Sequence, residues 1–286
     1  MSDVEAWQPS AREQERQAVR RSLRRRSLLV SSIATVVVLG ALVVGAVTSP
    51  GWATVKATFF SWSDAKASFP SIWHAFWTYN VKLFLIGEVL ILALALVVAV
   101  VRQSKAPVML PLRIIAVVYT DIFRGIPTIL LVFMLGFGMP ALGLQGVPTS
   151  LFFWGLVALV LSYGAYVAEV IRAGIESIHP SQIASADALG LSRFQAMRYV
   201  VVPQGIRRVV PPLLNDFISL QKDTALVGAA GLFDALFAAR DYANYQFNFT
   251  PYVVVACYFI VLTIPLARFT DHLQRRAMER ERQGAR

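Results

Sequence analysis

The segment SQIASADALGLSRFQ, residues 181–195, is polar and rich in small residues within a chain that is otherwise mostly apolar. The proline that precedes it suits the first turn of a helix, where its missing N–H needs no partner. Gly190 suits the left-handed position that follows a helix, and Ser192 with Gln195 has the S-x-x-Q spacing of a capping box. We therefore predict a short helix, a glycine turn and a second helix that Pro203 ends or kinks.

The rest of the chain has the composition of a membrane protein. Of its 286 residues, 56% are hydrophobic and 15% are charged, whereas soluble domains have about 25% charged residues. A helix needs roughly 20 apolar residues to cross a bilayer. A single short apolar run would also suit a buried core helix, but five long runs in one chain indicate membrane spans. They are residues 28–48, 83–101, 114–137, 150–171 and 251–267. Residues 209–230 form a doubtful sixth run, because prolines and charges interrupt it.

Basic residues indicate how these runs are oriented. Lys and Arg gather in residues 1–27, 102–113, 172–208 and 268–286, whereas the other connections hold few, among them Lys56, Lys66 and Arg240. Cytoplasmic loops carry the excess of Lys and Arg, and all four clusters fall on one side only if the sixth run also crosses. Both termini are then cytoplasmic. This rule accounts for the formal net charge of +10, so nucleic acid is not an expected partner.

The predicted organisation is an all-α integral membrane protein with about six transmembrane helices. The first run could be a signal peptide, but its apolar part is too long, and we expect an uncleaved anchor helix. Trp52, Trp62, Trp73, Trp77 and Tyr79 favour an interfacial position for the stretch that follows the anchor. The expected parts are a basic cytoplasmic tail (1–27), the anchor (28–48), an extracytoplasmic interfacial segment (49–80), a five-helix domain (81–270) with a cytoplasmic loop (174–208), and a cytoplasmic tail (271–286).

Motifs for catalysis are missing from the sequence. It contains no G-x-x-x-x-G-K-[ST], G-x-S-x-G or H-E-x-x-H pattern. Its histidines, His74, His179 and His272, are too far apart to suggest a metal site by spacing, and Cys257 is its single cysteine. We therefore expect no enzymatic activity, cofactor or metal in this chain.

Residues 184–204, ASADALGLSRFQAMRYVVVPQ, resemble the EAA loop of ABC-transporter permease subunits. Ser185, Ala186, Gly190, Val200 and Pro203 occupy the matching places, and the family's glutamate falls on Ala184. Three flanking segments resemble the polar amino-acid uptake branch of that family: YTDIFRGIPTILLVFMLGFGMP (119–140), AYVAEVIRAGIESI (165–178) and PQGIRRVVPPLLNDFISLQKDTALVGAAG (203–231). The resemblance covers roughly residues 75–270.

The resemblance implies a multi-pass permease subunit in the cytoplasmic membrane of a prokaryote, surrounded by membrane lipid. It implies three protein partners: a second permease subunit, the same or related; two cytoplasmic ATPase subunits, which hydrolyse ATP; and an extracytoplasmic binding protein, which delivers a polar amino acid. Helix 180–189 would be the coupling helix that enters a cleft of the ATPase. Its candidate contact residues are Ser181, Ala184, Ser185, Ala186, Asp187 and Gly190. The missing glutamate at Ala184 removes one polar contact from this surface.

Polar residues within the runs are candidates for the substrate path, because charges in a membrane face a cavity or a partner. The candidates are Asp121, Arg124, Glu169, Asn215, Lys222, Asp223 and Thr224. Arg124 leads them, since Gly125 and Pro127 break its helix and discontinuous helices bind ions and carboxylates in transporters. Pairing among these residues, such as Lys222 with Asp223, is the structural alternative. A channel or a secondary transporter without an ATPase is the functional alternative.

Overall fold

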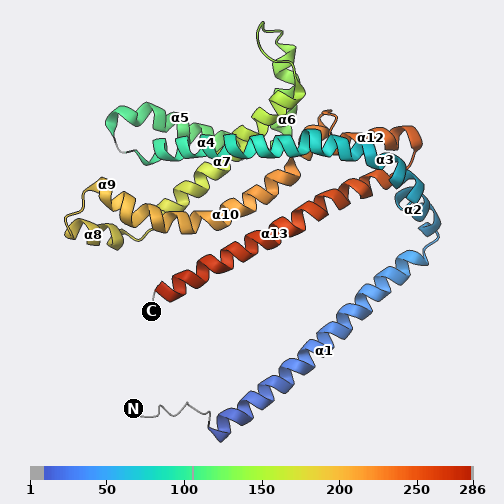
Figure 1. The fold of residues 1–286 in the computed structure, drawn as a ribbon, viewed down its shortest axis with the longest axis horizontal. Coiled ribbons are helices and arrows are strands. Elements are labelled where there is room, and N and C mark those ends of the chain that lie inside the picture. The colour runs from blue at the N-terminus through green and yellow to red at the C-terminus, as the bar shows by residue number, and fades with distance from the viewer. Residues whose placement is uncertain (1–9, 105, 285–286) are drawn as a thin grey trace. The chain divides into compact units, whose positions relative to one another are not determined.

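The computed structural model describes residues 10–104 and 106–284, and every regular element among them is helical. The first nine residues of the expected N-terminal tail, Lys105 and the last two residues of the C-terminal tail lie outside this description. The chain divides into two compact units, residues 1–57 and 58–286. Figure 1 shows the helices in chain order.

The first unit is dominated by α1 (Ala11–Val47), a helix of 37 residues. Ser10 caps it, because the Ser10 side chain accepts a hydrogen bond from the Glu13 N–H. The part from Leu23 to Val47 is long and apolar enough to cross a membrane. Helix α1 includes the expected anchor up to Val47, and it begins earlier, among the arginines of the basic tail.

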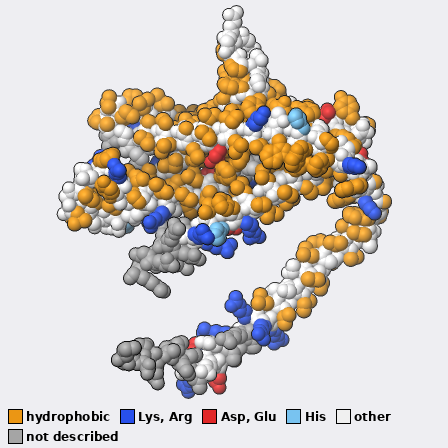
Figure 2. Space-filling view, viewed as in Figure 1, with side chains coloured by type: hydrophobic (Ala, Val, Ile, Leu, Met, Phe, Trp, Pro, Cys, Tyr) orange, Lys and Arg blue, Asp and Glu red, His pale blue; other side chains and the backbone are white. Residues whose placement is uncertain are grey.

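The second unit is built around α7 (Leu151–Glu176). This helix packs against α4 (Val81–Gln103), α5 (Leu110–Gly125), α6 (Thr128–Ala141) and α10 (Val202–Asp223). Small residues allow the close approach that membrane helices need: Gly155, Ala158, Ser162, Ala165 and Ala168 of α7 are all buried. Figure 2 shows hydrophobic side chains over most of the visible face of this unit, as expected where lipid surrounds it.

A second apolar cluster lies at the other end of α4. Helix α3 (Trp62–Ala75) packs there against α12 (Ala235–Gln246) and α13 (Thr250–Gly284). The buried side chains of this cluster include Ile72, Phe76, Ala239 and Val255. A π-turn, η1 (Phe76–Asn80), joins α3 directly to α4. The aromatic stretch is therefore helical from Trp62 onward, and this part continues into the membrane-spanning α4 without a break.

Within the described ranges, four helices are long and apolar enough to cross a membrane, and the number becomes five if the bent pair α5–α6 counts as one span. Helix α10 is not among them, because Pro211, Pro212 and several charged side chains lie within it. It ends at Asp223, and the short α11 (Ala225–Ala229) follows. The crossing of residues 209–230 thus remains a prediction from the distribution of charge.

Candidate functional site

The predicted helix-turn-helix is present as α8 (Pro180–Ala188) and α9 (Arg193–Ala196). His179 caps α8, because its Nδ1 accepts a hydrogen bond from the Ser181 N–H at 3.2 Å. At the other end Gly190 has a φ of +77°. The Gly190 N–H donates to the Asp187 carbonyl and the Leu191 N–H donates to the Ala186 carbonyl, which is the Schellman pattern of helix termination.

The second helix starts as predicted but does not stop at Pro203. The Ser192 hydroxyl accepts from the Gln195 N–H, and the Gln195 side chain accepts from the Ser192 N–H, so the capping box is complete. A π-turn, η3 (Met197–Val201), then leads into α10. Pro203 lies in the first turn of α10, where a proline needs no hydrogen bond to the preceding turn. Of the two expected outcomes at Pro203, an end of the helix is wrong, because the chain stays helical through it, and a kink stays a prediction.

Most of the candidate coupling residues are exposed on α8. Ser181, Ala184, Ser185, Asp187 and Gly190 are exposed. Ala186 is only 2% exposed, so it packs inward and supports the helix.

Two large apolar side chains next to α8 escaped the sequence analysis. Leu189 is 81% exposed and Phe194 is 72% exposed. Both stand in a segment predicted to be cytoplasmic, where apolar residues without a core to fill indicate a contact surface.

The base of the helix-turn-helix is attached to the membrane helices. Arg208 Nη1 of α10 donates a hydrogen bond to the Ser177 carbonyl at the end of α7. One turn earlier in α7, a Cβ atom on Gly174 would collide with the Val209 side chain of α10. The end of α7, which precedes α8, is therefore closely packed against α10.

Glu169 of α7 is the centre of a cluster of arginines. Its carboxylate lies 2.8 Å from Arg102 Nη1, 2.5 Å from Arg172 Nη2 and 3.8 Å from Arg124 Nη1. Arg172 also pairs with Glu176. Three guanidinium groups thus meet two carboxylates, which leaves one positive charge in excess.

Arg124 is the outermost member of this cluster. Its side chain is 40% exposed, against 13% for Arg102. Tyr166 orients it, because the Tyr166 hydroxyl donates to the Arg124 carbonyl at 3.0 Å and the guanidinium lies 5.9 Å from the Tyr166 ring centre. Helix α5 ends one residue later, and α6 leaves at an angle of 104°. The predicted helix break next to Arg124 is confirmed.

The other candidates are scattered over the structure. Asp121, Asn215 and Lys222 are exposed, and none of the ion pairs among the described residues joins Lys222 to Asp223. Asp223 accepts a hydrogen bond from the Tyr163 hydroxyl at 2.7 Å.

Thr224 is fully buried in a polar network with Asn80 and Asp234. Asn80 Nδ2 donates to the Thr224 hydroxyl at 3.2 Å and to Asp234 at 2.8 Å, and the Ala235 N–H donates to Asn80 Oδ1. Burial raises the pKa of Asp234 to about 6, although the Phe237 N–H and Asn80 donate to its carboxylate. In this arrangement Thr224 joins helices and does not face an open path.

Comparisons with known proteins agree with these features. Residues 108–279 match the family model described as binding-protein-dependent transport system inner membrane component. The probable glutamine ABC transporter permease protein GlnM of Bacillus subtilis (strain 168) is 34% identical over 194 residues, which are 67% of this chain and 88% of that protein. The probable amino-acid permease protein YxeN of the same organism is 30% identical, over 75% of this chain and 94% of that protein.

Solved structures share the fold. A crystal structure of an amino acid ABC transporter with histidines has a TM-score of 0.66 and 29% identity, and the match covers 73% of this chain and 94% of that one. An inward-facing MetNI methionine ABC transporter has a TM-score of 0.57 and 20% identity, over 72% of this chain and 95% of that one. With a family model that covers well over half of its length, this multi-pass chain belongs to the binding-protein-dependent transport system inner membrane components.

Proposed function

We propose that the chain is the permease subunit of an ATP-driven importer that carries a polar amino acid across the cytoplasmic membrane of a prokaryote. Its partners are a second permease subunit, two ATPase subunits and an extracytoplasmic binding protein. The observation that carries this proposal is the match of residues 108–279, which include the exposed α8–α9 segment and, from the arginine cluster, Arg124, Glu169 and Arg172. Relatives named as glutamine and amino-acid permeases support the substrate class.

Helix α8 is the coupling helix in this proposal. The exposed Leu189 and Phe194 provide apolar area beside it, and the ATPase supplies the cleft that covers them. Closure of the two ATPase subunits moves α8, and the Arg208–Ser177 hydrogen bond and the tight contact of Gly174 with Val209 pass the movement to α10 and α7. ATP hydrolysis belongs to the partner subunit, and this chain provides a bistable arrangement of helices.

Arg124 is the proposed contact for the substrate carboxylate. Its guanidinium belongs to a cluster with one excess positive charge, and an arginine can hold a carboxylate through two parallel hydrogen bonds. The amino end of α6 begins four residues later at Thr128, and free N–H groups at a helix start favour an anion. The Arg102 and Arg172 side chains are engaged by Glu169, so they fix the cluster in place.

Copurification tests the coupling role. Gly190→Val forces a β-branched residue into a φ of +77°, which costs on the order of 1 kcal/mol or more. Less ATPase subunit should copurify with this variant and transport should be uncoupled, while the chain remains inserted. Gly143→Val is the matched control, because Gly143 also has positive φ (+59°) and open space around it but lies in the α6–α7 loop. Full ATPase binding and full uptake by Gly190→Val would show that α8 does not couple.

A further inference from the structure

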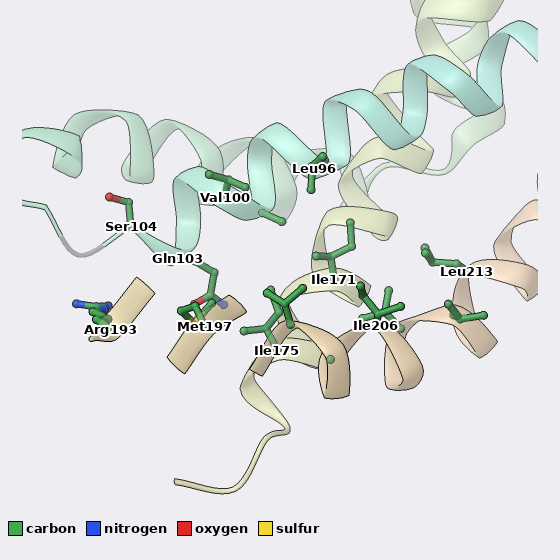
Figure 3. Close-up of a pocket in the computed structure, with 15 residues that line it drawn as sticks. Leu96, Val100, Gln103, Ser104, Ile171, Ile175, Arg193, Met197, Ile206 and Leu213 are labelled. Carbon is green, nitrogen blue, oxygen red and sulfur yellow. The ribbon is translucent and has the colours of Figure 1, made fainter. Parts of the chain in front are cut away.

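A cavity of about 680 Å³ opens between α4, α7 and the helix that runs from η3 into α10. Figure 3 shows the side chains that line it. Its walls are apolar: α4 contributes Leu96 and Val100, α7 contributes Ile171 and Ile175, and α10 contributes Ile206 and its neighbours. Its volume lies within the ~300–1,000 Å³ of sites that hold small molecules.

The polar residues of the cavity lie together at one end. Gln103 is the last residue of α4, Ser104 follows it, and Arg193 is the first residue of α9. Figure 3 shows all three on the side away from Leu96 and Leu213. Arg193 is the one charged residue among those that line the cavity. It is exposed, and none of the ion pairs in the described parts of the chain includes it.

The polar end lies at the predicted cytoplasmic surface of the membrane. Gln103 is the last residue of α4, and the basic clusters 102–113 and 172–208 fall on the same side. Leu96 precedes Gln103 by seven residues, which corresponds to about 10 Å along a helix. The cavity thus extends from a basic mouth at the surface into the apolar layer, which is the polarity of a phospholipid molecule in the inner leaflet.

We propose that this cavity binds an anionic phospholipid of the cytoplasmic leaflet. One acyl chain fills the space between Val100, Ile175 and Ile206, and the phosphate lies at Arg193, within reach of the amide of Gln103 and the hydroxyl of Ser104. Charge selects the occupant, because a positive side chain at the mouth and apolar walls inside complement a negative headgroup on a hydrocarbon chain. The lipid then holds α9 against the end of α4, directly beside the coupling helix.

Native mass spectrometry of the purified full chain in detergent tests this site. The probes are phosphatidylglycerol and phosphatidylcholine with identical acyl chains. One arginine near the membrane surface favours the anionic lipid about fivefold, so the wild type should retain phosphatidylglycerol over phosphatidylcholine by about that factor. Arg193→Gln should remove the preference and leave phosphatidylcholine binding unchanged. Arg198→Gln is the matched control, because Arg198 is an exposed arginine five residues later that does not line the cavity, and it should keep the preference.

Filling the cavity tests the acyl chain. Ile206→Trp and Val100→Phe enlarge side chains that are more than half exposed on opposite walls, so each should fold and each should lower binding of both lipids. Gel filtration verifies that the variants are monodisperse, and free glycerol 3-phosphate should not compete. The proposal is overturned if Arg193→Gln and Arg198→Gln lower the preference equally, if both filled variants bind lipid normally, or if glycerol 3-phosphate displaces the lipid. It is also overturned if Arg193→Gln abolishes ATPase copurification while the lipid preference persists, since Arg193 then contacts the ATPase.

Discussion

Arg124 Nη1 lies 3.8 Å from Glu169 Oε2, whereas Arg102 Nη1 lies 2.8 Å from the same oxygen. The two arginines therefore differ in what they can do. Arg102 is held by Glu169 and also donates to the Thr120 hydroxyl at 3.1 Å, so it has a structural role. Arg124 makes a loose contact and keeps an exposed guanidinium that an incoming carboxylate can approach.

Arg124→Ala should raise the substrate concentration needed for half-maximal uptake by roughly tenfold or more, because a hydrogen-bonded charge contact is worth about 1.5–3 kcal/mol. ATPase copurification should be unchanged. The measurement is uptake in proteoliposomes, with ATPase activity followed in parallel. The half-saturating substrate concentration of Arg124→Lys should lie between those of the wild type and Arg124→Ala, since lysine keeps the charge and loses the planar guanidinium. Normal uptake at both low and saturating substrate would exclude Arg124 as a carboxylate contact.

Thr224 should prove to be structural. Thr224→Val keeps the shape of the side chain and removes the hydroxyl that accepts from Asn80 Nδ2. The free energy of unfolding should therefore fall by about 1–3 kcal/mol, and the half-saturating substrate concentration should not change. Asn80→Leu should cost more, because the Ala235 N–H and the Asp234 carboxylate also lose their partner. Thermal unfolding in detergent and uptake separate the two roles. A loss of substrate affinity at full stability would return Thr224 to the substrate path.

Local sequence chemistry predicted the α8–α9 turn well, because its capping groups lie within five residues of their partners and need no tertiary contact. The same holds for the break at Gly125, Ile126 and Pro127. The partners of Thr224 and Glu169 could not be predicted in this way. Asn80 is 144 residues from Thr224 and Arg102 is 67 residues from Glu169, so only the packing of α4 against α7 and α10 brings them together. The sequence alone does not decide whether the helix ends or continues at Pro203, because a proline permits either and a π-turn leaves no clear signature in the sequence.

The orientation of α10 should follow the arginines. Because residues 102–113, 172–208 and 268–286 carry the basic clusters, we expect α10 and α11 to bring the chain across, with residue 240 outside and the C-terminus inside. Reporter fusions after residue 240 and at the C-terminus measure this directly. A fusion at residue 187, within the predicted cytoplasmic loop, provides the internal reference. Reporters at 187 and 240 on the same side would remove this span, and the C-terminus with its basic cluster would then lie outside.

Gly174 should be required for the transmission of movement between α7 and α10. A methyl group at this position meets the Val209 side chain, and overpacking of this kind costs about 1–3 kcal/mol. Gly174→Ala should therefore lower both thermal stability and uptake per ATP hydrolysed. Gly138→Ala is the matched control, because Gly138 also lies in a helix but has open space around it.

A second substitution separates a steric cause from any other. Val209→Ala removes the methyl groups that collide with the added Cβ, so the double variant Gly174→Ala/Val209→Ala should regain much of the loss, although Val209→Ala alone leaves a small cavity. A double-mutant cycle on stability and on coupled uptake measures this interaction. If the losses of stability and of coupled uptake in the two single variants simply add in the double variant, the side chains at 174 and 209 do not collide. The close packing of α7 against α10 at this point would then not explain the effect of Gly174→Ala.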